Sequence, residues 1–579
     1  MVLAAMLIFV AACSGGKNAD STAPASSQAS SETSASPEAQ KEITLTVFSH
    51  TANYAGEQPG WFAKILKDKF NVKLNIVAPN LQGGATKFAA MMASGDLGDL
   101  IYIGSNGKDY KDAIKAGLLL DLNKDGLLEK HGQNVLKYAG EAVEANKKQY
   151  GGGTSVYGVG SGIGSGEGPS EGTVMNFGPD LRWDLYAKLG YPEIKTLNDY
   201  LPVLKKMQEL EPKSESGRPT YGFSLWGDWD GNAMSAGNFL AQMHGYDMSD
   251  GFNQAQMTYF AVNEQKYQGI IDDNSYYMQA IRFYFDANQM GLLDPESLTQ
   301  KFDDAANKYR DGQIFFSHFP WLGASSYNTT ERVEQGKGFA LVPFQDEKVL
   351  SWGFNPHGGG FSWSIGSKTK DPARVMQIID YLFSPDGMME TGTGPKGLAW
   401  DLDKDGKPFL TEFGKKAVAD GTVQVPAEYG GGMWKDGANQ INGSSLHISM
   451  VNPNTGEPYD NKLWTSVLND NPNPLTKSWR EKTGVSTSKE YFVKNNLIAI
   501  LKPVFTGNAP ETPPTDIETK VGAIGKVIKE NSWKMIYAKN EAEFDKLKQE
   551  MVTKAKGLGY DEVVNWEVDR TKRTVWDAQ

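Results

Sequence analysis

The stretch between residues 43 and 103 decides the fold, because two kinds of apolar pattern alternate along it. Its segments are ITLTVF at 43–48, WFAKIL at 61–66, VKLNIV at 72–77, KFAAMMAS at 87–94 and LIYI at 100–103. The first, third and fifth are short and rich in β-branched or apolar residues, which predicts strands, whereas the second and fourth have helical character. This order predicts an α/β fold in which helices cover a parallel sheet.

Upstream of this stretch, the chain begins with a signal-like segment and a linker. The apolar run LIFV at 7–10 is too short to span a membrane and is typical of a secretory signal. VAAC at 10–13 resembles the lipobox of bacterial lipoproteins, in which the cysteine is acylated; the alternative is a plain secretory peptide with a chance cysteine at Cys13. Residues 14–40 are rich in Ser, Ala, Pro and Glu and predict a flexible linker.

Composition excludes several classes of protein. The 579 residues suffice for two large lobes or three ordinary domains. A formal net charge of −12 argues against nucleic-acid binding, because it repels a phosphate backbone. The single cysteine allows no internal disulfide, and no later stretch has eighteen continuous apolar residues. The chain has 14 Trp, 24 Tyr and 26 Phe, many of which must be core, so aromatic content alone does not identify a ligand surface.

A series of motifs resembles one protein family. They are ASGDLGDL at 93–100, AIKAGLLLDLN at 113–123, RWDLY at 182–186, KLGYP at 188–192, TLNDY at 196–200, GLLDP at 291–295, FFSHFPW at 315–321 and ARVMQIIDYLFSPDG at 373–387. Their order resembles the extracellular solute-binding proteins of bacterial ABC sugar importers, in particular the large oligosaccharide-binding lipoproteins of family 1. The sequence departs from this family at Gly98, where proline is usual.

The resemblance implies a periplasmic-binding-protein-like α/β fold with two lobes, several interlobe crossings and a ligand cleft between the lobes. The expected division is lobe 1 at 42–165 and 343–395, and lobe 2 at 175–342 and 400–579.

The expected crossings between these lobes lie at three places. The glycine-rich run 151–172 suits the first crossing or a mobile cleft loop, and a surface excursion is the alternative. The second crossing is expected after residues 339–343, and the third near 392–400.

Motifs for ATP hydrolysis by a P-loop and for zinc catalysis are not found: the sequence has no GxxxxGK[ST], and none of its six histidines forms HExxH. The alternating glycines at 158–168 do not give the dinucleotide-binding pattern GxGxxG. One acidic loop does match a calcium-binding pattern, DxDxDG followed by an acid at position twelve; its residues are Asp401, Asp403, Asp405 and Glu412. The strand-like flanks and the Asp-Gly turn favour a β-hairpin, and bound calcium is the alternative.

An aromatic and acidic loop is the strongest indication of ligand binding. Residues 225–231, LWGDWDG, contain Trp226, Asp228, Trp229 and Asp230. Aromatic rings stack on the CH face of a sugar while carboxylates accept hydrogen bonds from its hydroxyl groups, and acids resist burial in a core. The alternative is a loop whose indoles pack back on the lobe.

Other aromatic residues and histidines are expected to join this loop in a ligand site. The resemblance places a stacking tryptophan at Trp321, shortly after His318, and a core position is the alternative. In the same arrangement, Trp352 and Trp363 flank a loop that contains His357 and faces the cleft. Trp434, which follows GGGM at 430–433, is a further candidate.

The leading functional hypothesis is a binding protein without catalysis that needs no cofactor. It captures an oligosaccharide between two lobes and passes it to an ABC permease, whose ATPase is a separate subunit. The resemblance and the lipobox imply a monomer anchored by lipid at Cys13 to the outer face of the cytoplasmic membrane. The alternatives are a secreted hydrolase or lyase that uses Asp228 and Asp230, and a peptide-binding importer component.

Overall fold

The computed structural model of the chain describes residues 41–105, 107–251, 254–470 and 472–573. Residues from Glu42 onward form one compact unit, which contains both lobes. The predicted signal segment, Cys13 and the linker at 14–40 lie outside the described residues.

The first lobe is built on a six-stranded sheet with the order β2-β3-β1-β4-β13-β5. Its strands are β1 (Ile43–Ser49), β2 (Gly56–Glu57), β3 (Val72–Val77), β4 (Leu100–Gly104), β5 (Val159–Gly160) and β13 (Phe361–Ile365). Strands β3, β1 and β4 run parallel, as the sequence predicts, and β13 adds to β4 in the antiparallel direction.

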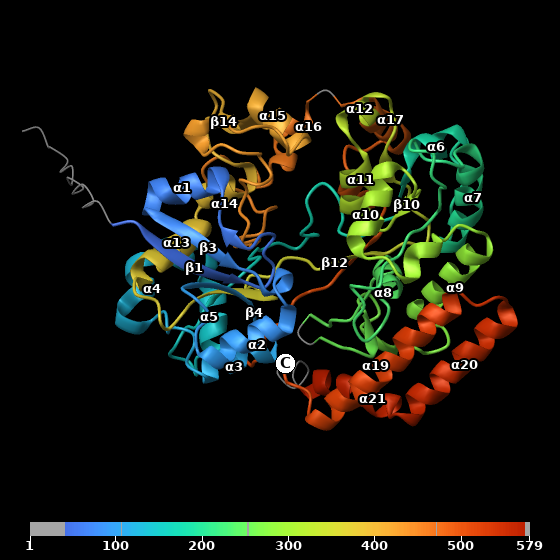
Figure 1. Cartoon of the computed structure of the whole chain (residues 1–579), viewed down its shortest axis with the longest axis horizontal. Helices are drawn as coiled ribbons and strands as arrows, with labels where there is room; N and C mark the ends of the chain where they lie inside the picture. The colour runs from blue at the N-terminus through green and yellow to red at the C-terminus, as the bar shows by residue number, and fades with distance from the viewer. Residues whose placement is uncertain (1–40, 106, 252–253, 471, 574–579) are drawn as a thin grey trace, which may run out of the picture. The chain divides into compact units, whose positions relative to one another are not determined.

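Helices cover both faces of this sheet (Figure 1). They are α1 (Gly60–Phe70), α2 (Gly84–Ser94), α3 (Lys108–Lys115), α4 (Leu127–His131), α5 (Gln133–Gln149), α13 (Pro372–Leu382) and α14 (Pro385–Thr393). Alternate strand residues face opposite sides: Val47 packs with α1 and α13, whereas Phe48 packs with Phe88 of α2 and Tyr110 of α3. The period-two pattern therefore defines two apolar layers, one on each face.

Gly98 fits a tight connection into β4. Its φ is +98°, and a Cβ at this position would lie 2.9 Å from the carbonyl oxygen of Thr46. Proline is held near φ −65°, so the residue that is usual in the family does not fit this backbone conformation. The neighbouring Asp99 closes the turn, because its backbone N–H donates to Thr46 O and its carboxylate accepts the Thr46 N–H.

The second lobe surrounds a short three-stranded antiparallel sheet with the order β10-β6-β11. The strands are β6 (Asp180–Arg182), β10 (Phe316–Ser317) and β11 (Phe339–Leu341). The helices are α6 (Trp183–Lys188), α7 (Tyr200–Leu210), α8 (Ser235–Gln242), α9 (Tyr276–Gln289), α10 (Phe302–Asp311), α11 (Pro320–Tyr327), α12 (Thr330–Glu334), α17 (Pro474–Thr483), α18 (Ser488–Lys494), α19 (Thr515–Ile536), α20 (Glu541–Gly557) and α21 (Tyr560–Thr571). The last three lie side by side at one side of this lobe (Figure 1).

The lobe boundaries differ from the expected ones. Trp400, Leu410 and Trp464 pack in the core of the first lobe, although residues from 400 onward were expected in the second. The chain crosses between the cores at 164–174, at 351–360 and between Val467 and Leu475. The first crossing lies in the glycine-rich run, and the other two lie further along the chain than the sequence suggests, because an apolar pattern does not indicate which core will bury it.

The described residues include no helix that is both long and apolar enough to cross a membrane.

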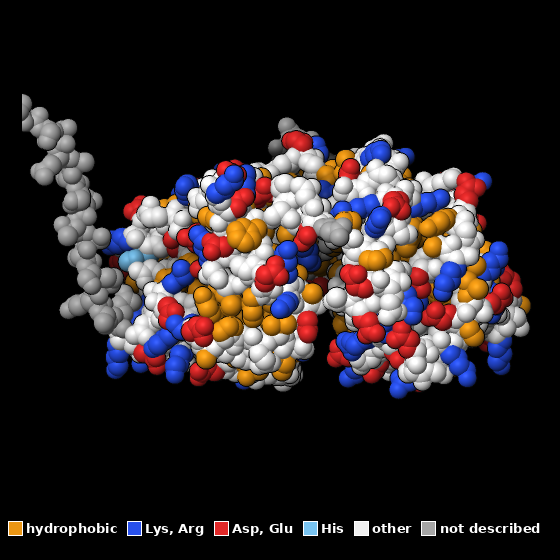
Figure 2. All heavy atoms as spheres, turned by 90° about the horizontal axis from the view of Figure 1, so that it is seen from above, with side chains coloured by type: hydrophobic (Ala, Val, Ile, Leu, Met, Phe, Trp, Pro, Cys, Tyr) orange, Lys and Arg blue, Asp and Glu red, His pale blue; other side chains and the backbone are white. Residues whose placement is uncertain are grey.

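Lys and Arg side chains lie among Asp and Glu side chains on the face shown in Figure 2.

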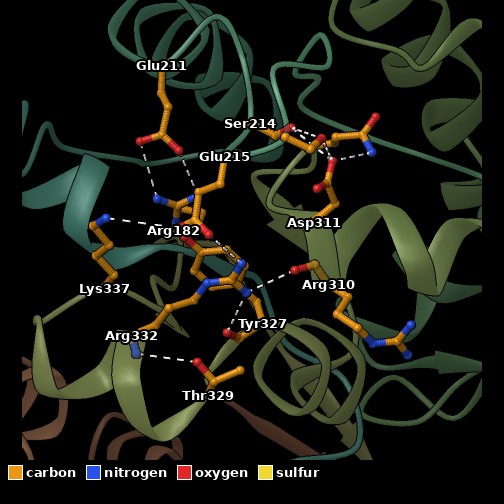
Figure 3. A network of polar contacts seen from close by, with 12 residues as sticks. Arg182, Glu211, Ser214, Glu215, Arg310, Asp311, Tyr327, Thr329, Arg332 and Lys337 are labelled. Carbon is orange, nitrogen blue, oxygen red and sulfur yellow. Dashed lines mark hydrogen bonds and ion pairs between the residues drawn. The ribbon is translucent and has the colours of Figure 1, made fainter.

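Arg182, at the beginning of the second lobe, is fully buried. Figure 3 shows it within a network of polar contacts that includes Glu211. Arg182 donates to both carboxylate oxygens of Asp184, at 2.9 and 2.8 Å, and to Glu211. Its guanidinium also lies 4.3 Å from the ring centre of Tyr327, which Arg332 covers at 4.0 Å. Burial acts to lower the pKa of Arg182, but the hydrogen bonds and charge of Asp184 outweigh it and keep the arginine charged.

Replacing Asp184 with alanine should lower the free energy of unfolding by about 3–5 kcal/mol, because Arg182 would remain buried without its bidentate partner. Glu215→Ala is the control: this carboxylate pairs with Arg332 but is 54% exposed, so its loss should cost about 1 kcal/mol or less. Urea-induced unfolding followed by circular dichroism measures both, and equal effects of the two substitutions would contradict the role of Asp184.

Candidate ligand-binding site

Three tryptophans of the second lobe present exposed rings, and we call them the aromatic platform. Trp229, Trp321 and Trp352 are 40%, 42% and 41% exposed. Trp229 stacks on Phe302 of α10 with ring centres 4.5 Å apart, and it lies 6.2 Å from Trp321 at an interplanar angle of 29°. Large aromatic side chains that remain exposed together are typical of a binding surface.

Two buried phenylalanines connect Trp352 to the other two tryptophans of the platform. Phe319 lies 4.8 Å from Trp321, Phe177 lies 5.8 Å from Phe319, and Phe177 packs edge-on against Trp352 at 5.4 Å. Residues 177, 319 and 352 come from separate segments of the chain, so the surface exists only in the folded protein.

A buried carboxyl group orients Trp352. Its indole N–H donates to the carboxylate of Asp247 at 3.3 Å, and Gln242 donates to the other oxygen of that carboxylate at 3.0 Å. Burial raises the pKa of Asp247, although these hydrogen bonds act to lower it.

The loop at 225–231 divides its side chains between the platform and the core. Trp229 is exposed, but Trp226 is 2% exposed and packs edge-on against it at 5.3 Å. His318 is equally buried and lies parallel to Trp226 with ring centres 6.3 Å apart. Contrary to the expectation that both contact ligand, Trp226 and His318 support the platform from beneath.

The acids of this loop bind the protein itself. The carboxylate of Asp228 accepts the backbone N–H of Phe302 at 3.1 Å. The carboxylate of Asp230 accepts the N–H of Ser235 and the indole N–H of Trp533, both at 2.8 Å. Burial raises the pKa of Asp230, against the opposing effect of these hydrogen bonds. Both acids therefore hold the loop in the position that exposes Trp229.

Three further predicted residues lie in the first lobe. Trp363 is fully buried in β13 and donates its indole N–H to Ser444 O at 2.7 Å, so it is a core residue, contrary to expectation. Trp434 stacks on buried Trp61 with ring centres 4.9 Å apart and also packs on that core. His357 is half-buried and stacks on Phe505 at 4.2 Å.

Sequence reasoning missed two aromatic contributions. Phe302 supports Trp229 directly, and Phe505 covers His357 although the two are far apart in the sequence. Neither phenylalanine lies in a motif that indicates binding; their roles follow from contacts between distant segments.

The predicted calcium loop is a β-hairpin turn. Strands β14 (Trp400–Leu402) and β15 (Pro408–Leu410) pair in the antiparallel direction on either side of it. One oxygen of Asp403 accepts the backbone N–H groups of Asp405 and Lys407, at 2.9 and 2.8 Å. Glu412 begins α15 (Glu412–Ala419) and lies near Lys415. Across the described ranges, no group of three or more His, Cys, Asp or Glu side chains is arranged to hold a metal.

Comparison with known proteins assigns the chain to a family. Residues 61–398 match the model of the bacterial extracellular solute-binding protein family. No curated protein sequence matches significantly. The chain belongs to the bacterial extracellular solute-binding protein family, whose members are binding proteins rather than enzymes.

Solved structures share the two-lobed fold. Alginate-binding protein AlgQ2 without calcium ion has 16% identity and a TM-score of 0.58, with 91% of this chain and 97% of that chain covered. FusA, an ABC-transporter substrate-binding protein of S. pneumoniae in complex with kestose, has 17% identity and a TM-score of 0.56, with 91% and 100% covered. An HMO-binding, ABC-transporter-associated solute-binding protein of Bifidobacterium longum infantis has 14% identity and a TM-score of 0.57, with 93% and 100% covered.

Replacing His318 with phenylalanine should make stability less sensitive to acid. Burial lowers the pKa of His318 to about 3, whereas a histidine in the unfolded chain has its ordinary pKa of about 6.5. Below about pH 6.5 the unfolded chain therefore takes up a proton that the folded protein does not, and stability falls as the pH falls.

Between pH 7 and pH 5, this histidine should contribute a loss of about 2 kcal/mol in the free energy of unfolding, which His318→Phe should remove. Chemical denaturation of both proteins at the two pH values measures the difference. An identical pH dependence of the two proteins would contradict a neutral His318 beneath the platform.

Proposed function

We propose that this protein is the substrate-binding component of a carbohydrate ABC importer. It captures an oligosaccharide between its two lobes and delivers it to a membrane permease. The aromatic platform is the observation that carries this proposal, because three exposed indole rings on one lobe offer successive stacking surfaces for sugar rings.

The known proteins of similar fold support the ligand class. The proteins compared above are described as binding alginate, kestose and HMO. Their identities of 14–17% establish only a shared fold, so the ligand class is proposed for this chain because the platform agrees with it.

Closure around the ligand requires contacts from both lobes, since a ligand shifts a conformational equilibrium only by binding one state better. The second lobe supplies Trp229, Trp321 and Trp352. From the first lobe we propose Tyr54, which is 43% exposed, and His357, on which Phe505 of the segment between β16 and α19 stacks. Hinge closure would then bring aromatic groups to both sides of one sugar chain.

The enzyme alternative has less support than the binding alternative. Hydrolysis or elimination needs carboxyl groups free to exchange protons with the substrate. The carboxylates of Asp228 and Asp230 are instead engaged by backbone N–H groups and by Trp533. A peptide ligand remains an outcome that the experiment below can detect.

The N-terminal sequence suggests how the protein reaches its permease. We propose that Cys13 is acylated and that residues 14–40 tether the lobes to the outer face of the cytoplasmic membrane. Such a tether raises the effective concentration of loaded protein near the permease and its ATPase. The protein would act as a monomer and without a cofactor.

Calorimetric titration with a panel of oligosaccharides tests the ligand class, and a parallel assay for reducing ends tests for hydrolysis. We expect saturable binding of one sugar class and no release of reducing ends. A flat response to every sugar, together with binding of peptides, would overturn the proposal.

The variant Trp321→Ala should raise Kd about 10- to 30-fold, because one stacking surface is lost. Trp566→Ala is the matched control, since Trp566 lies on α21 and packs on Arg570 instead of the platform. Equal affinities of the two variants would contradict the role of the platform, and melting temperatures confirm that both are folded.

A further inference from the structure

A proline-rich segment in the C-terminal half, residues 502–514, contacts both lobes. Its sequence is KPVFTGNAPETPP, and it connects β16 (Ile498–Ile500) to α19 without forming a helix or strand. Four of its thirteen residues are proline, which fixes φ and stiffens an extended chain. Most of its residues are nevertheless half-buried, so the segment lies against the protein surface.

Both ends of this segment are anchored in the second lobe. Leu501 and Ile517, on either side of it, are buried in the second core. The Leu501 N–H donates to Ser351 O at 2.8 Å, and the Val504 N–H donates to Gly251 O at 3.1 Å.

The segment approaches the backbone of Gly251 closely, and an ion pair holds it to the second lobe at a further point. A Cβ at Gly251, whose φ is +89°, would lie 2.4 Å from the carbonyl oxygen of Lys502, so only glycine admits this approach. Further along the segment, Glu511 pairs with Arg573 at 3.1 Å. The segment is therefore held to the second lobe at several points along its length.

The middle of the segment is fastened to the first lobe. Phe505 stacks on His357 with ring centres 4.2 Å apart and an interplanar angle of 10°. Lys111 of α3 donates to Pro510 O at 2.6 Å and to the Thr512 hydroxyl at 3.3 Å. The Gln149 amide, at the end of α5, donates to Asn508 O at 3.2 Å.

We propose that residues 502–514 form an interlobe strap that limits how far the lobes separate when no ligand is bound. The strap leaves the second lobe, contacts the first and returns, so it differs from the three crossings that carry the chain from one core to the other. Separating the lobes must break the stack of Phe505 on His357 and the hydrogen bonds of Lys111. The proline residues stiffen the strap, so it cannot lengthen to keep these contacts as the lobes move apart.

The strap also connects lobe spacing to the ligand site. His357 lies five residues after Trp352 of the platform, within the crossing at 351–360. The β12 strand (Val349–Ser351) that leads into this crossing pairs with β16, which leads into the strap. A displacement of the strap is thus transmitted to the segment that bears Trp352, and release of the strap would allow the two lobes to open wider.

Spin–spin distance measurements on the full chain without ligand test this proposal. Labels are placed at Lys416→Cys in the first lobe and Lys206→Cys in the second, both exposed positions, with Cys13→Ser removing the only native cysteine. In this background, Lys111→Met and Phe505→Leu should each broaden the distance distribution toward longer separations, and the double variant should do so further. Lys115→Met is the control, because Lys115 is an exposed lysine of the same helix.

Distributions for Lys111→Met and Phe505→Leu that superimpose on that of Lys115→Met would overturn the strap proposal. Circular dichroism and melting temperature establish that each variant is folded. If Phe505→Leu fails to fold, the Lys111→Met result decides alone, since this change removes a charged group that is not part of either core. Because no ligand is added, failure of the proposed function would leave this test unaffected.

Discussion

The exposure of three tryptophan rings depends on the close packing of aromatic side chains beneath them. Indole rings on a surface gain stability by turning inward, unless the space below is already filled. Here Phe302, Phe319 and Phe177 fill that space, and buried Trp226 and His318 complete the layer under Trp229. The platform is therefore preorganised, and a ligand that stacks on it need not pay for ordering these rings.

The acids around this layer determine its position. Asp228, Asp230 and Asp247 each accept hydrogen bonds from protein N–H groups, and through them the 225–231 loop is joined to α10 and α19 while Trp352 is held in one orientation. The sequence pairs acids with tryptophans, which suggested hydroxyl recognition. In the folded protein these acids instead orient aromatic rings. A partly buried carboxylate is stabilised by nearby N–H donors, and the hydrogen bonds that it accepts hold the loop and the indole of Trp352 in place. The aromatic platform and its support are thus built from one short loop and its neighbours.

The sequence predicts local elements well and their assembly less well. The parallel strands at 43–48, 72–77 and 100–103, and the hairpin at 400–410, follow from short-range patterns and are confirmed. Trp229 and Trp363 could not be distinguished, since each is an aromatic residue beside polar ones and only tertiary packing leaves the first exposed and the second buried. The same limit explains the misplaced boundary at residue 400 and the missed role of Phe505, whose partner His357 is distant in sequence. Contacts of this kind depend on which segments share a core, and periodicity carries no information about that choice.

We propose that Trp229, Trp321 and Trp352 together form the surface that contacts the ligand. Oxidative footprinting with and without a saturating oligosaccharide, read residue by residue by mass spectrometry, tests it most directly. Oxidation of these three tryptophans should fall when ligand is bound, while that of Trp566 on α21 should be unchanged. Unchanged oxidation of all three in the presence of a bound sugar would contradict it.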